Sequence, residues 1–259
     1  MSSTPDFDLT GTTALVTGGS RGIGRMITEG LLRRGARVYV CSRKQHELDA
    51  TAAELAAIGD IRTFTADLGT ADGVHALATH LTDQESTLRL LVNNAGANWG
   101  APIDDFPDSA WDKVLNVNLK GVFVLTQALL PLLRAASVPG DPARVVNIGS
   151  IDGLRAPERG YNNFSYAASK AGVHLLTQQL SAELAPGITV NAIAPGLFES
   201  KMTGALLESA RDQVSEQIPM GRIGAPDDVA GLVAYLAGPT SSYVTGAVIP
   251  LDGGVSAHR

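Results

Sequence analysis

The stretch that decides the fold reads Thr13-Ala14-Leu15-Val16-Thr17-Gly18-Gly19-Ser20-Arg21-Gly22-Ile23-Gly24. Its first half is a short and almost wholly apolar run, typical of a strand that is buried on both faces of a parallel sheet. Its second half is rich in glycine, and the residues after it repeat at the i, i+3, i+4, i+7 spacing of an amphipathic helix. That helix face holds Ile23, Met26, Ile27, Gly30 and Leu31. The stretch therefore predicts a strand, a glycine turn and a helix in direct succession.

Such a turn points backbone N–H groups and the positive end of a helix dipole at whatever lies above the strand, which suits a pyrophosphate. An ordinary tight turn with flexible glycines is the alternative. A nucleotide site is favoured because the glycines at 18, 22 and 24, a Thr/Ser pair and both expected elements occur together. The spacing Gly18-x-x-x-Gly22-x-Gly24 differs from the commoner Gly-x-Gly-x-x-Gly fingerprint. It resembles instead the short-chain dehydrogenase/reductase family.

Length, charge and cysteine content limit the classes of protein to which the chain can belong. The 259 residues contain no low-complexity linker or repeat, so we expect a single domain over residues 1–259. A net charge of −6 argues against a nucleic-acid-binding protein, which would normally show a basic face. The lone Cys41 excludes an internal disulfide framework and is typical of a reducing compartment. With no signal sequence and no apolar run of about 18 residues, the sequence predicts a cytoplasmic protein that does not enter a membrane. No metal site is predicted.

Apolar runs of strand length alternate with helical patterns along the rest of the chain. Later strands are predicted at 38–41, 61–65, 88–92, 143–148, 188–193 and 246–250, and helices at 45–58, 71–82, 109–134, 166–184, 203–213 and 226–236. This alternation predicts a doubly wound α/β fold of the Rossmann type, with a parallel sheet and helices on both faces. The least regular stretches, about 151–165 and 194–225, both follow strands. Because ligands bind outside the carboxyl ends of strands in such sheets, we expect these two loops to form the substrate pocket.

The end of the second predicted strand indicates which nicotinamide cofactor the fold would take. It reads Cys41-Ser42-Arg43-Lys44 and contains no carboxylate. An acidic residue at this place hydrogen-bonds the ribose 2′-hydroxyl of NAD, whereas an Arg accommodates the 2′-phosphate of NADP. Arg21, in the glycine turn, adds a second cation, and a guanidinium can bind a phosphate through two hydrogen bonds. Single surface cations are often merely solvated, but the missing acid and the paired cations together favour NADP over NAD.

Tyr166 and Lys170 are the sharpest chemical signal in the chain. At positions i and i+4 their side chains lie on one face of a helix, one turn apart. A free Tyr has a pKa near ~10, too high for useful acid–base work at neutral pH, and a neighbouring ammonium lowers it. Such a pair often occurs by chance on a helix. Beside a nucleotide-binding turn, it predicts a catalytic acid–base pair.

Two further polar residues are candidate partners of this pair. Ser150 ends the predicted fifth strand, where its hydroxyl can reach a substrate carbonyl or simply cap a turn. Asn118 falls on the buried stripe of the helix predicted over 109–134, and an amide buried there must find a partner. It is either a satisfied core amide or part of a proton path.

Taken together, these segments resemble the short-chain dehydrogenase/reductase family over essentially the whole chain. The matching motifs, in order, are Thr17 to Gly24, Asn93 to Gly96, Asn118, Ser150, Tyr166 with Lys170, Pro195-Gly196 and Asp252-Gly253-Gly254. The resemblance implies a seven-stranded parallel sheet of order 3-2-1-4-5-6-7 and, usually, a homotetramer or homodimer. It implies NADP contacts from Gly18, Ser20, Arg21, Gly22, Ile23, Gly24, Ser42, Arg43, Asp67, Leu68, Asn94, Ala95, Gly96, Tyr166, Lys170, Pro195 and Gly196.

The resemblance also implies a reaction, the interconversion of a ketone and a secondary alcohol. Tyr166 would give a proton to the substrate oxygen while hydride reaches the carbonyl carbon, and Ser150 would hydrogen-bond that oxygen. Lys170 would lower the pKa of Tyr166 and bind the nicotinamide ribose. Asn118 would hold, through its carbonyl, a water that links Lys170 to solvent.

The substrate is less well indicated than the reaction. Several loop segments resemble NADPH-dependent 3-oxoacyl reductases, so an acyl thioester is the expected substrate. The same segments occur among reductases and dehydrogenases of sugars, polyols, gluconate and cyclic ketones, which remain alternatives. A catalytically silent dinucleotide-binding regulator is an alternative of another class.

One segment departs from the family pattern. Ser150 and Tyr166 are sixteen positions apart, a few more than usual in the family, and the extra length lies in 154–163. Tyr161 lies in this segment, but it has no Lys four residues later, so Tyr166 stays the candidate. Near the predicted mouth, Trp99 either lines the pocket or anchors a loop. Arg155, Arg159 and Lys201 are either solvated charges or an attractive surface for a phosphopantetheine or an acidic carrier.

Overall fold

The apolar run at the start of the nucleotide motif forms an interior strand of the sheet. In a computed structural model, which describes residues 7–157, 159–200 and 203–257, β1 (Thr13–Thr17) is buried throughout. The other strands are β2 (Arg37–Ser42), β3 (Ile61–Thr65), β4 (Leu90–Asn93), β5 (Ala143–Ile148), β6 (Ile188–Pro195) and β7 (Val248–Leu251). Neighbouring strands are parallel in the order β3-β2-β1-β4-β5-β6-β7. The predicted fold class and strand order are confirmed.

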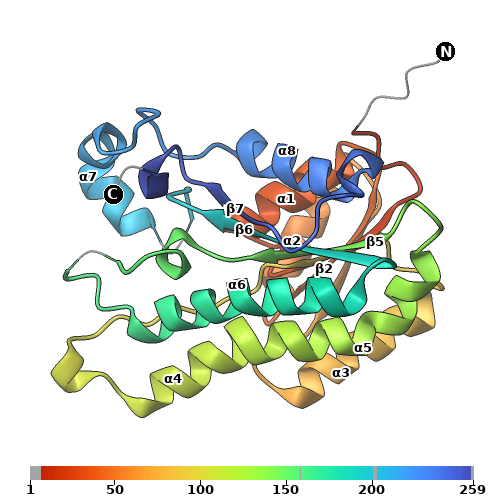
Figure 1. The fold of residues 1–259 in the computed structure, drawn as a ribbon, viewed down its shortest axis with the longest axis horizontal. Helices are drawn as coiled ribbons and strands as arrows, with labels where there is room; N and C mark the ends of the chain where they lie inside the picture. The colour runs from red at the N-terminus through yellow and green to blue at the C-terminus, as the bar shows by residue number, and fades with distance from the viewer. Residues whose placement is uncertain (1–6, 158, 201–202, 258–259) are drawn as a thin grey trace.

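Helices cover both faces of the sheet (Figure 1). One face carries α1 (Gly22–Leu32), α2 (Gln45–Leu55) and α8 (Pro226–Ala237). The other carries α3 (Ala71–Gln84), α5 (Gly121–Ala136) and α6 (Phe164–Leu184). Ala14 and Val16 of β1 pack into the first layer and Leu15 into the second, as the period of two along a strand requires. Because both faces are covered, the strand is apolar at every one of these positions.

The helix predicted over 109–134 is continuous but is not α-helical throughout. It consists of α4 (Asp108–Leu115), a π-helical turn η2 (Asn116–Lys120) and α5. A π turn inserts a residue without ending the helix, so the apolar stripe continues and the sequence pattern does not reveal it. Asn118 lies inside this turn. The last helix before α8 is α7 (Gly204–Glu216), which follows β6 in the chain.

The continuous helical stretch Asp108–Ala136 is, within the described residues, long and apolar enough to cross a membrane by length and composition alone. The sequence pattern does not predict this, because polar and charged residues interrupt the apolar run. Its Leu125, Leu129 and Leu133 are fully buried in the core between α3 and the sheet. These residues therefore have their apolar partners inside the protein.

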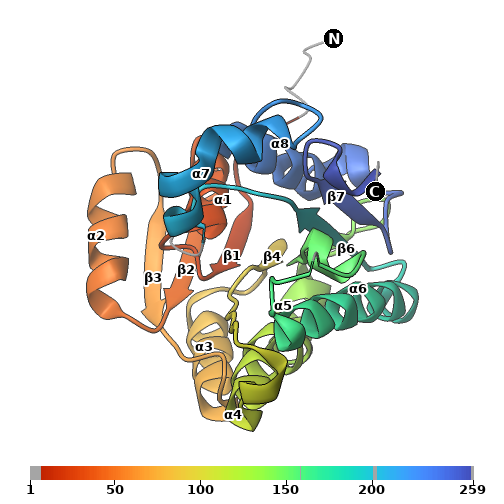
Figure 2. The same cartoon turned by 90° about the vertical axis from the view of Figure 1, so that its left-hand side faces the viewer.

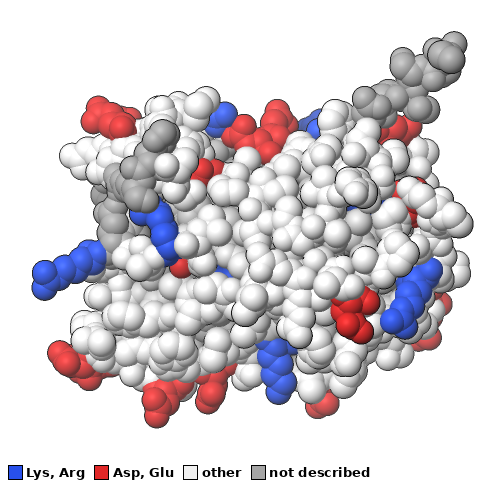
Figure 3. Space-filling view, viewed as in Figure 1, with Lys and Arg blue, Asp and Glu red and all other residues white. Residues whose placement is uncertain are grey.

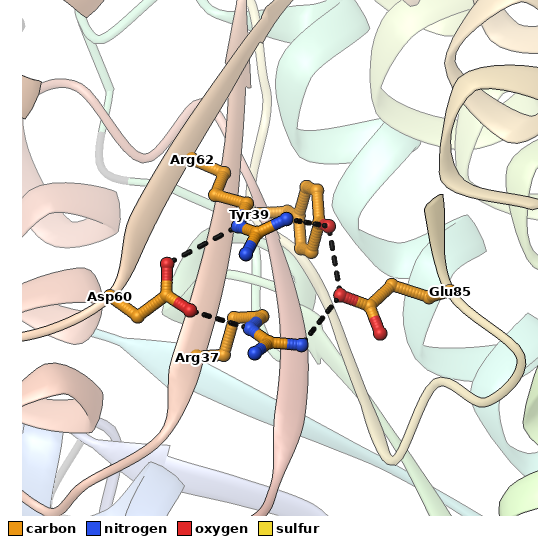
Figure 4. A network of polar contacts seen from close by, with 5 residues as sticks. All are labelled: Arg37, Tyr39, Asp60, Arg62 and Glu85. Atoms are coloured by element: carbon orange, nitrogen blue, oxygen red, sulfur yellow. Dashed lines mark hydrogen bonds and ion pairs between the residues drawn. The ribbon is translucent and has the colours of Figure 1, made fainter. Parts of the chain in front are cut away.

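A polar network fastens the amino ends of β2 and β3 to the end of α3 (Figure 4). Arg37 donates hydrogen bonds to Asp60 at 2.6 Å and to Glu85 at 3.0 Å, and the Tyr39 hydroxyl donates to the same Glu85 oxygen at 2.8 Å. Arg62 donates to Asp60 at 3.2 Å and lies 5.8 Å from the centre of the Tyr39 ring. The network closes the end of the sheet opposite the ligand-binding end, so it has a structural role.

Candidate active site

A cavity of about 520 Å³ lies outside the carboxyl ends of the strands, the end of the sheet that faces the viewer in Figure 2. Residues that follow β1, β2, β3, β4, β5 and β6 line it. Every residue that the sequence analysis assigned to the site, except Asn118, is among them. The structure therefore brings the predicted cofactor and catalytic residues together around one cavity.

The glycine turn forms one wall of this cavity and leaves no room for a side chain at Gly18 or Gly24. Gly18 and Gly22 have φ values of +65° and +51°, a conformation that residues with a Cβ rarely adopt. A Cβ on Gly24 would lie only 2.3 Å from the Asn94 amide nitrogen. Helix α1 starts at Gly22 with no side-chain cap and no acidic residue in its first turn, so its first N–H groups are free to bind a ligand. The wall fits a pyrophosphate.

Asn94 fixes the glycine turn to the loop after β4. Its side-chain amide donates to the carbonyl oxygens of Thr17 at 2.8 Å and Gly18 at 3.2 Å. In return, the Thr17 hydroxyl accepts hydrogen bonds from the backbone N–H groups of Asn94 and Ala95, both at 2.9 Å. These bonds hold the two cofactor-binding loops in one register. Thr17 belongs to the predicted motif but not to the predicted site residues.

The end of β2 brings cations to the cavity, together with a carboxylate that the sequence analysis missed. Ser42, Arg43 and Arg21 line the cavity as expected, and so does Glu47 from the first turn of α2. The Glu47 carboxylate lies 3.0 Å from the Lys44 ammonium and 3.6 Å from the Arg21 guanidinium. The hydrogen bond from Lys44, with the nearby positive charges, holds the pKa of Glu47 below its ordinary value, so the group is ionised at neutral pH.

Tyr166, Lys170 and Ser150 meet at the other end of the cavity. Lys170 donates a hydrogen bond from Nζ to the Ile148 carbonyl oxygen at 2.7 Å, and its ammonium lies 5.6 Å from the centre of the Tyr166 ring. The Ser150 hydroxyl accepts from the backbone N–H of Asp152 at 3.1 Å and lies near enough to Tyr166 to act on the pKa of its phenol. One face of α6 thus places the phenol beside the serine at the end of β5.

Burial governs the protonation of this cluster. It raises the pKa of Tyr166 to about 12, with the nearby Ser150 hydroxyl opposing the rise and the Asp152 charge adding to it. Burial also lowers the pKa of Lys170 to about 8. The expected lowering of the Tyr166 pKa by Lys170 is therefore not found, because the ammonium is directed to Ile148 and burial dominates. At neutral pH the phenol is protonated and can donate its proton.

Asn118 is the exception among the assigned residues, since it is buried behind the cavity. Its Oδ1 accepts from the Ala97 N–H at 2.7 Å, and its Nδ2 donates to the Ala97 carbonyl and to the Ser169 hydroxyl, both at 2.9 Å. Its side-chain amide is therefore fully engaged in joining the loop after β4 to α6. Of the two alternatives given by the sequence, the side chain of Asn118 is therefore a satisfied core amide.

The comparisons with known proteins agree with this geometry. The chain matches the family model described as Enoyl-(Acyl carrier protein) reductase over residues 18–256. It is 47% identical, over 96% of this chain and 98% of the relative, to the rhamnolipids biosynthesis 3-oxoacyl-(acyl-carrier-protein) reductase of Pseudomonas aeruginosa. The chain belongs to the short-chain dehydrogenase/reductase family. It is therefore an oxidoreductase of that family.

Two solved structures of this family are similar over nearly the whole chain. One is the Pseudomonas aeruginosa RhlG/NADP active-site complex, with a TM-score of 0.93, 46% identity and coverage of 97% of this chain and 99% of that chain. The other is a putative NAD(P)-dependent gluconate 5-dehydrogenase from Beutenbergia cavernae with bound NADP, with a TM-score of 0.88, 36% identity and coverage of 97% and 99%.

The segment that is longer than usual for this family lies beside the loop after β4, but none of its described residues lines the cavity. Its end is joined to the loop after β4, since the Ala101 N–H donates to the Asn162 carbonyl at 3.3 Å. Asn163 donates to the Asp152 carboxylate at 2.9 Å, which ties the start of the segment to its end. Trp99, on the facing loop, is partly exposed and has the Lys113 ammonium 5.1 Å from its ring centre. Of the predicted mouth cations, Lys201 lies outside the described residues.

Proposed function

We propose that this chain reduces the 3-oxo group of an acyl thioester to a secondary alcohol with NADPH. The observation that carries the proposal is that Ser150 and Tyr166 line one end of a cavity whose other end holds Arg21 and Arg43. The acyl thioester is proposed because the relative that shares 47% of its residues over 96% of the chain is named as a 3-oxoacyl reductase.

The residues present fit the cofactor that the family uses. The glycine turn and the start of α1 would hold the pyrophosphate, and Arg21 with Arg43 would hold the 2′-phosphate. Asp67 and Leu68 would border the adenine, and Lys170 would hydrogen-bond the nicotinamide ribose. Ala95, Gly96, Pro195 and Gly196 would line the remaining walls. When bound, NADPH supplies the hydride for the carbonyl carbon.

The chain's own residues would handle the proton and the charge on the substrate oxygen. Tyr166, protonated because burial raises its pKa, would donate its proton to that oxygen. Ser150 would hydrogen-bond the same oxygen and stabilise the charge that develops on it. Lys170 would hold the cofactor ribose while keeping the end of β5 in place through Ile148. Asn118 would act as a positioning residue between the loop after β4 and α6, and its backbone carbonyl would hold the water of the proton path.

A sugar or polyol substrate is the second candidate, favoured by the similarity to a structure described as a gluconate 5-dehydrogenase. The two are separated by one assay of the purified protein. We expect NADPH oxidation with acetoacetyl-CoA, and no NADP⁺ reduction with gluconate. Turnover with gluconate alone would overturn the acyl assignment. Binding of NADP⁺ without turnover of either substrate would favour a silent dinucleotide-binding regulator.

Replacement of the proposed proton donor tests the mechanism itself. Tyr166→Phe is expected to leave NADP⁺ binding near that of the wild type and to lower kcat by at least ~100-fold, the usual contribution of general acid catalysis. Tyr161→Phe is the matched control, because Tyr161 precedes Tyr166 closely in the chain but is 58% exposed and does not line the cavity. Both variants would be measured for kcat and for NADP⁺ affinity. Equal kcat values for the two variants would contradict the assignment of Tyr166.

We also propose that residues 1–259 form one domain that assembles as a homodimer or homotetramer in the cytoplasm. One sheet contains strands from both halves of the chain, which supports the single domain. The buried Cys41 is a free thiol, which agrees with a reducing compartment. For assembly, α5 and α6 have few charged residues, and the surface over α6 is almost free of them (Figure 3).

A further inference from the structure

The proposed 2′-phosphate site contains its own negative charge. Glu47 lies in the first turn of α2 and lines the same cavity as Ser42, Arg43 and Lys44. Its carboxylate contacts Lys44 at 3.0 Å and Arg21 at 3.6 Å. The two cations are about half exposed, whereas the Glu47 side chain is only 24% exposed. The carboxylate therefore contacts both cations at the lining of the cavity, where a phosphate would have to compete with it for them.

This placement opposes the binding of a 2′-phosphate. A phosphate monoester is close to a dianion at neutral pH, and it binds best where cations are free to donate to it. Here Glu47 already neutralises two of the cations, and its own charge repels the phosphate. Arg43 lines the cavity and forms no ion pair among the described residues. It is the cation best able to receive the phosphate without competition.

The same carboxylate favours the binding of a ribose that carries no 2′-phosphate. In dinucleotide-binding folds, a carboxylate near the end of the second strand accepts a hydrogen bond from the ribose 2′-hydroxyl of NAD. The strand end itself, Cys41-Ser42-Arg43-Lys44, has none. Glu47 supplies a carboxylate at this place, because it lies in the first turn of α2, directly after the strand end, and lines the cavity.

We propose that Glu47 is a specificity-determining residue that reduces the preference of this chain for NADP over NAD. It does so by competing with the 2′-phosphate for Arg21 and Lys44 and by accepting from the 2′-hydroxyl of NAD. Because Arg43 can still bind the 2′-phosphate, the chain binds NADP more tightly than NAD. This inference rests on the proposed use of a nicotinamide dinucleotide at this site.

The test is a comparison of ligand affinities in the unmodified enzyme and in Glu47→Gln. Calorimetry with adenosine 2′,5′-bisphosphate and with 5′-AMP isolates the phosphate from the rest of the cofactor. NADP⁺ and NAD⁺ are then measured in the same way. We expect Glu47→Gln to raise the ratio of the NAD⁺ to the NADP⁺ dissociation constant by roughly three- to tenfold, and to tighten the 2′,5′-bisphosphate to a similar extent. The gain should shrink at high salt because screening weakens these partly exposed charges.

Glu54→Gln is the matched control. Glu54 is on the same helix and pairs with Arg25 at 2.5 Å, but it does not line the cavity. This variant makes the same change in net charge and should leave all four affinities as they are. An unchanged or lowered ratio in Glu47→Gln, or an equal rise in Glu54→Gln, would overturn the role of Glu47 alone. Failure of the unmodified enzyme to bind either dinucleotide would overturn the proposed cofactor as well.

Discussion

At the scale of single residues, the burial of Lys170 has a consequence for stability that can be measured. Its pKa is lowered from 10.5 to about 8 in the folded protein. Between these pH values the unfolded chain keeps a proton that the folded protein has lost, so stability rises with pH across this interval. From pH 7 to pH 9.5 this residue should add roughly 2 kcal/mol to the free energy of unfolding. Tyr166 titrates above this window, since burial raises its pKa.

Lys170→Met should remove this rise, because the variant has no group to titrate there. The measurement is urea unfolding at pH 7 and pH 9.5 for the wild type, Lys170→Met and Lys113→Met. Lys113 is exposed, so its variant should follow the wild type. Parallel pH dependence in all three proteins would mean that burial does not lower the pKa of Lys170.

The motif residues could be predicted from sequence because each belongs to a local pattern. Tyr166 and Lys170 are one helical turn apart, and the glycines occur where a turn must follow a buried strand. Glu47 could not be predicted in this way, because its approach to Arg21 depends on how α2 packs against β2. The spacing of Lys44 and Glu47 was the only local signal. The raised pKa of Tyr166 was missed for a similar reason, since burial depends on the whole fold.

At the scale of elements, the contact between α6 and the turn after β5 positions the proposed catalytic serine. His174 is one helical turn beyond Lys170 and is 6% exposed. A Cβ on Gly149 would lie 2.1 Å from its Nε2, and a Cβ on Gly153 would lie 2.9 Å from its Cε1. The imidazole therefore packs directly on the backbone beside Ser150. The helix can approach this closely only because both contact positions are glycine.

Gly149→Ala should force the His174 imidazole away from the turn after β5, because the added methyl group needs the same space. We expect a loss of about 1–3 kcal/mol in stability from overpacking, together with a lower kcat because Ser150 moves relative to Tyr166. His174→Ala in the same chain makes room for the methyl group, so the double variant should recover part of both losses. Gly231→Ala in α8 is the control, since nothing lies within 4 Å of a Cβ there. It should be neutral or slightly stabilising. If the losses in the double variant equal the sum of the losses in Gly149→Ala and in His174→Ala, a direct contact between the two residues is contradicted.

The helices and strands could be predicted from the periodicity of apolar residues, and their boundaries differ from the predictions by only a few residues. The π turn at Asn116–Lys120 did not, because one inserted residue leaves the apolar stripe intact. Nor could the sequence indicate that Asn163 and Asp152 close the longer segment, since both are polar residues in a loop without a pattern.

At the scale of the whole molecule, the outer surface of α5 and α6 is unusual for an isolated chain. Arg134 is the only charged residue of α5, and α6 has only Glu183 besides the buried Lys170. Leu175 is 67% exposed and Phe123 is 39% exposed on these helices. Apolar surface of this kind marks contacts between proteins, and most assemblies of identical chains are closed and symmetric. This is the surface that we propose for the homodimer or homotetramer.

A charge placed on this surface should break the assembly. Leu175→Lys would bring two lysines together near a symmetry axis or bury one without a partner, and either case costs more than a typical contact gains. Val138→Lys is the matched control, because Val138 is 53% exposed but lies in the connection between α5 and β5. We expect sedimentation velocity to show the wild type and Val138→Lys as the same dimer or tetramer, and Leu175→Lys as a smaller species with an unchanged far-ultraviolet spectrum. A monomeric wild type would refute the assembly. A Leu175→Lys protein of wild-type size would place the interface elsewhere, because a lysine cannot be accommodated in an apolar contact without loss of affinity.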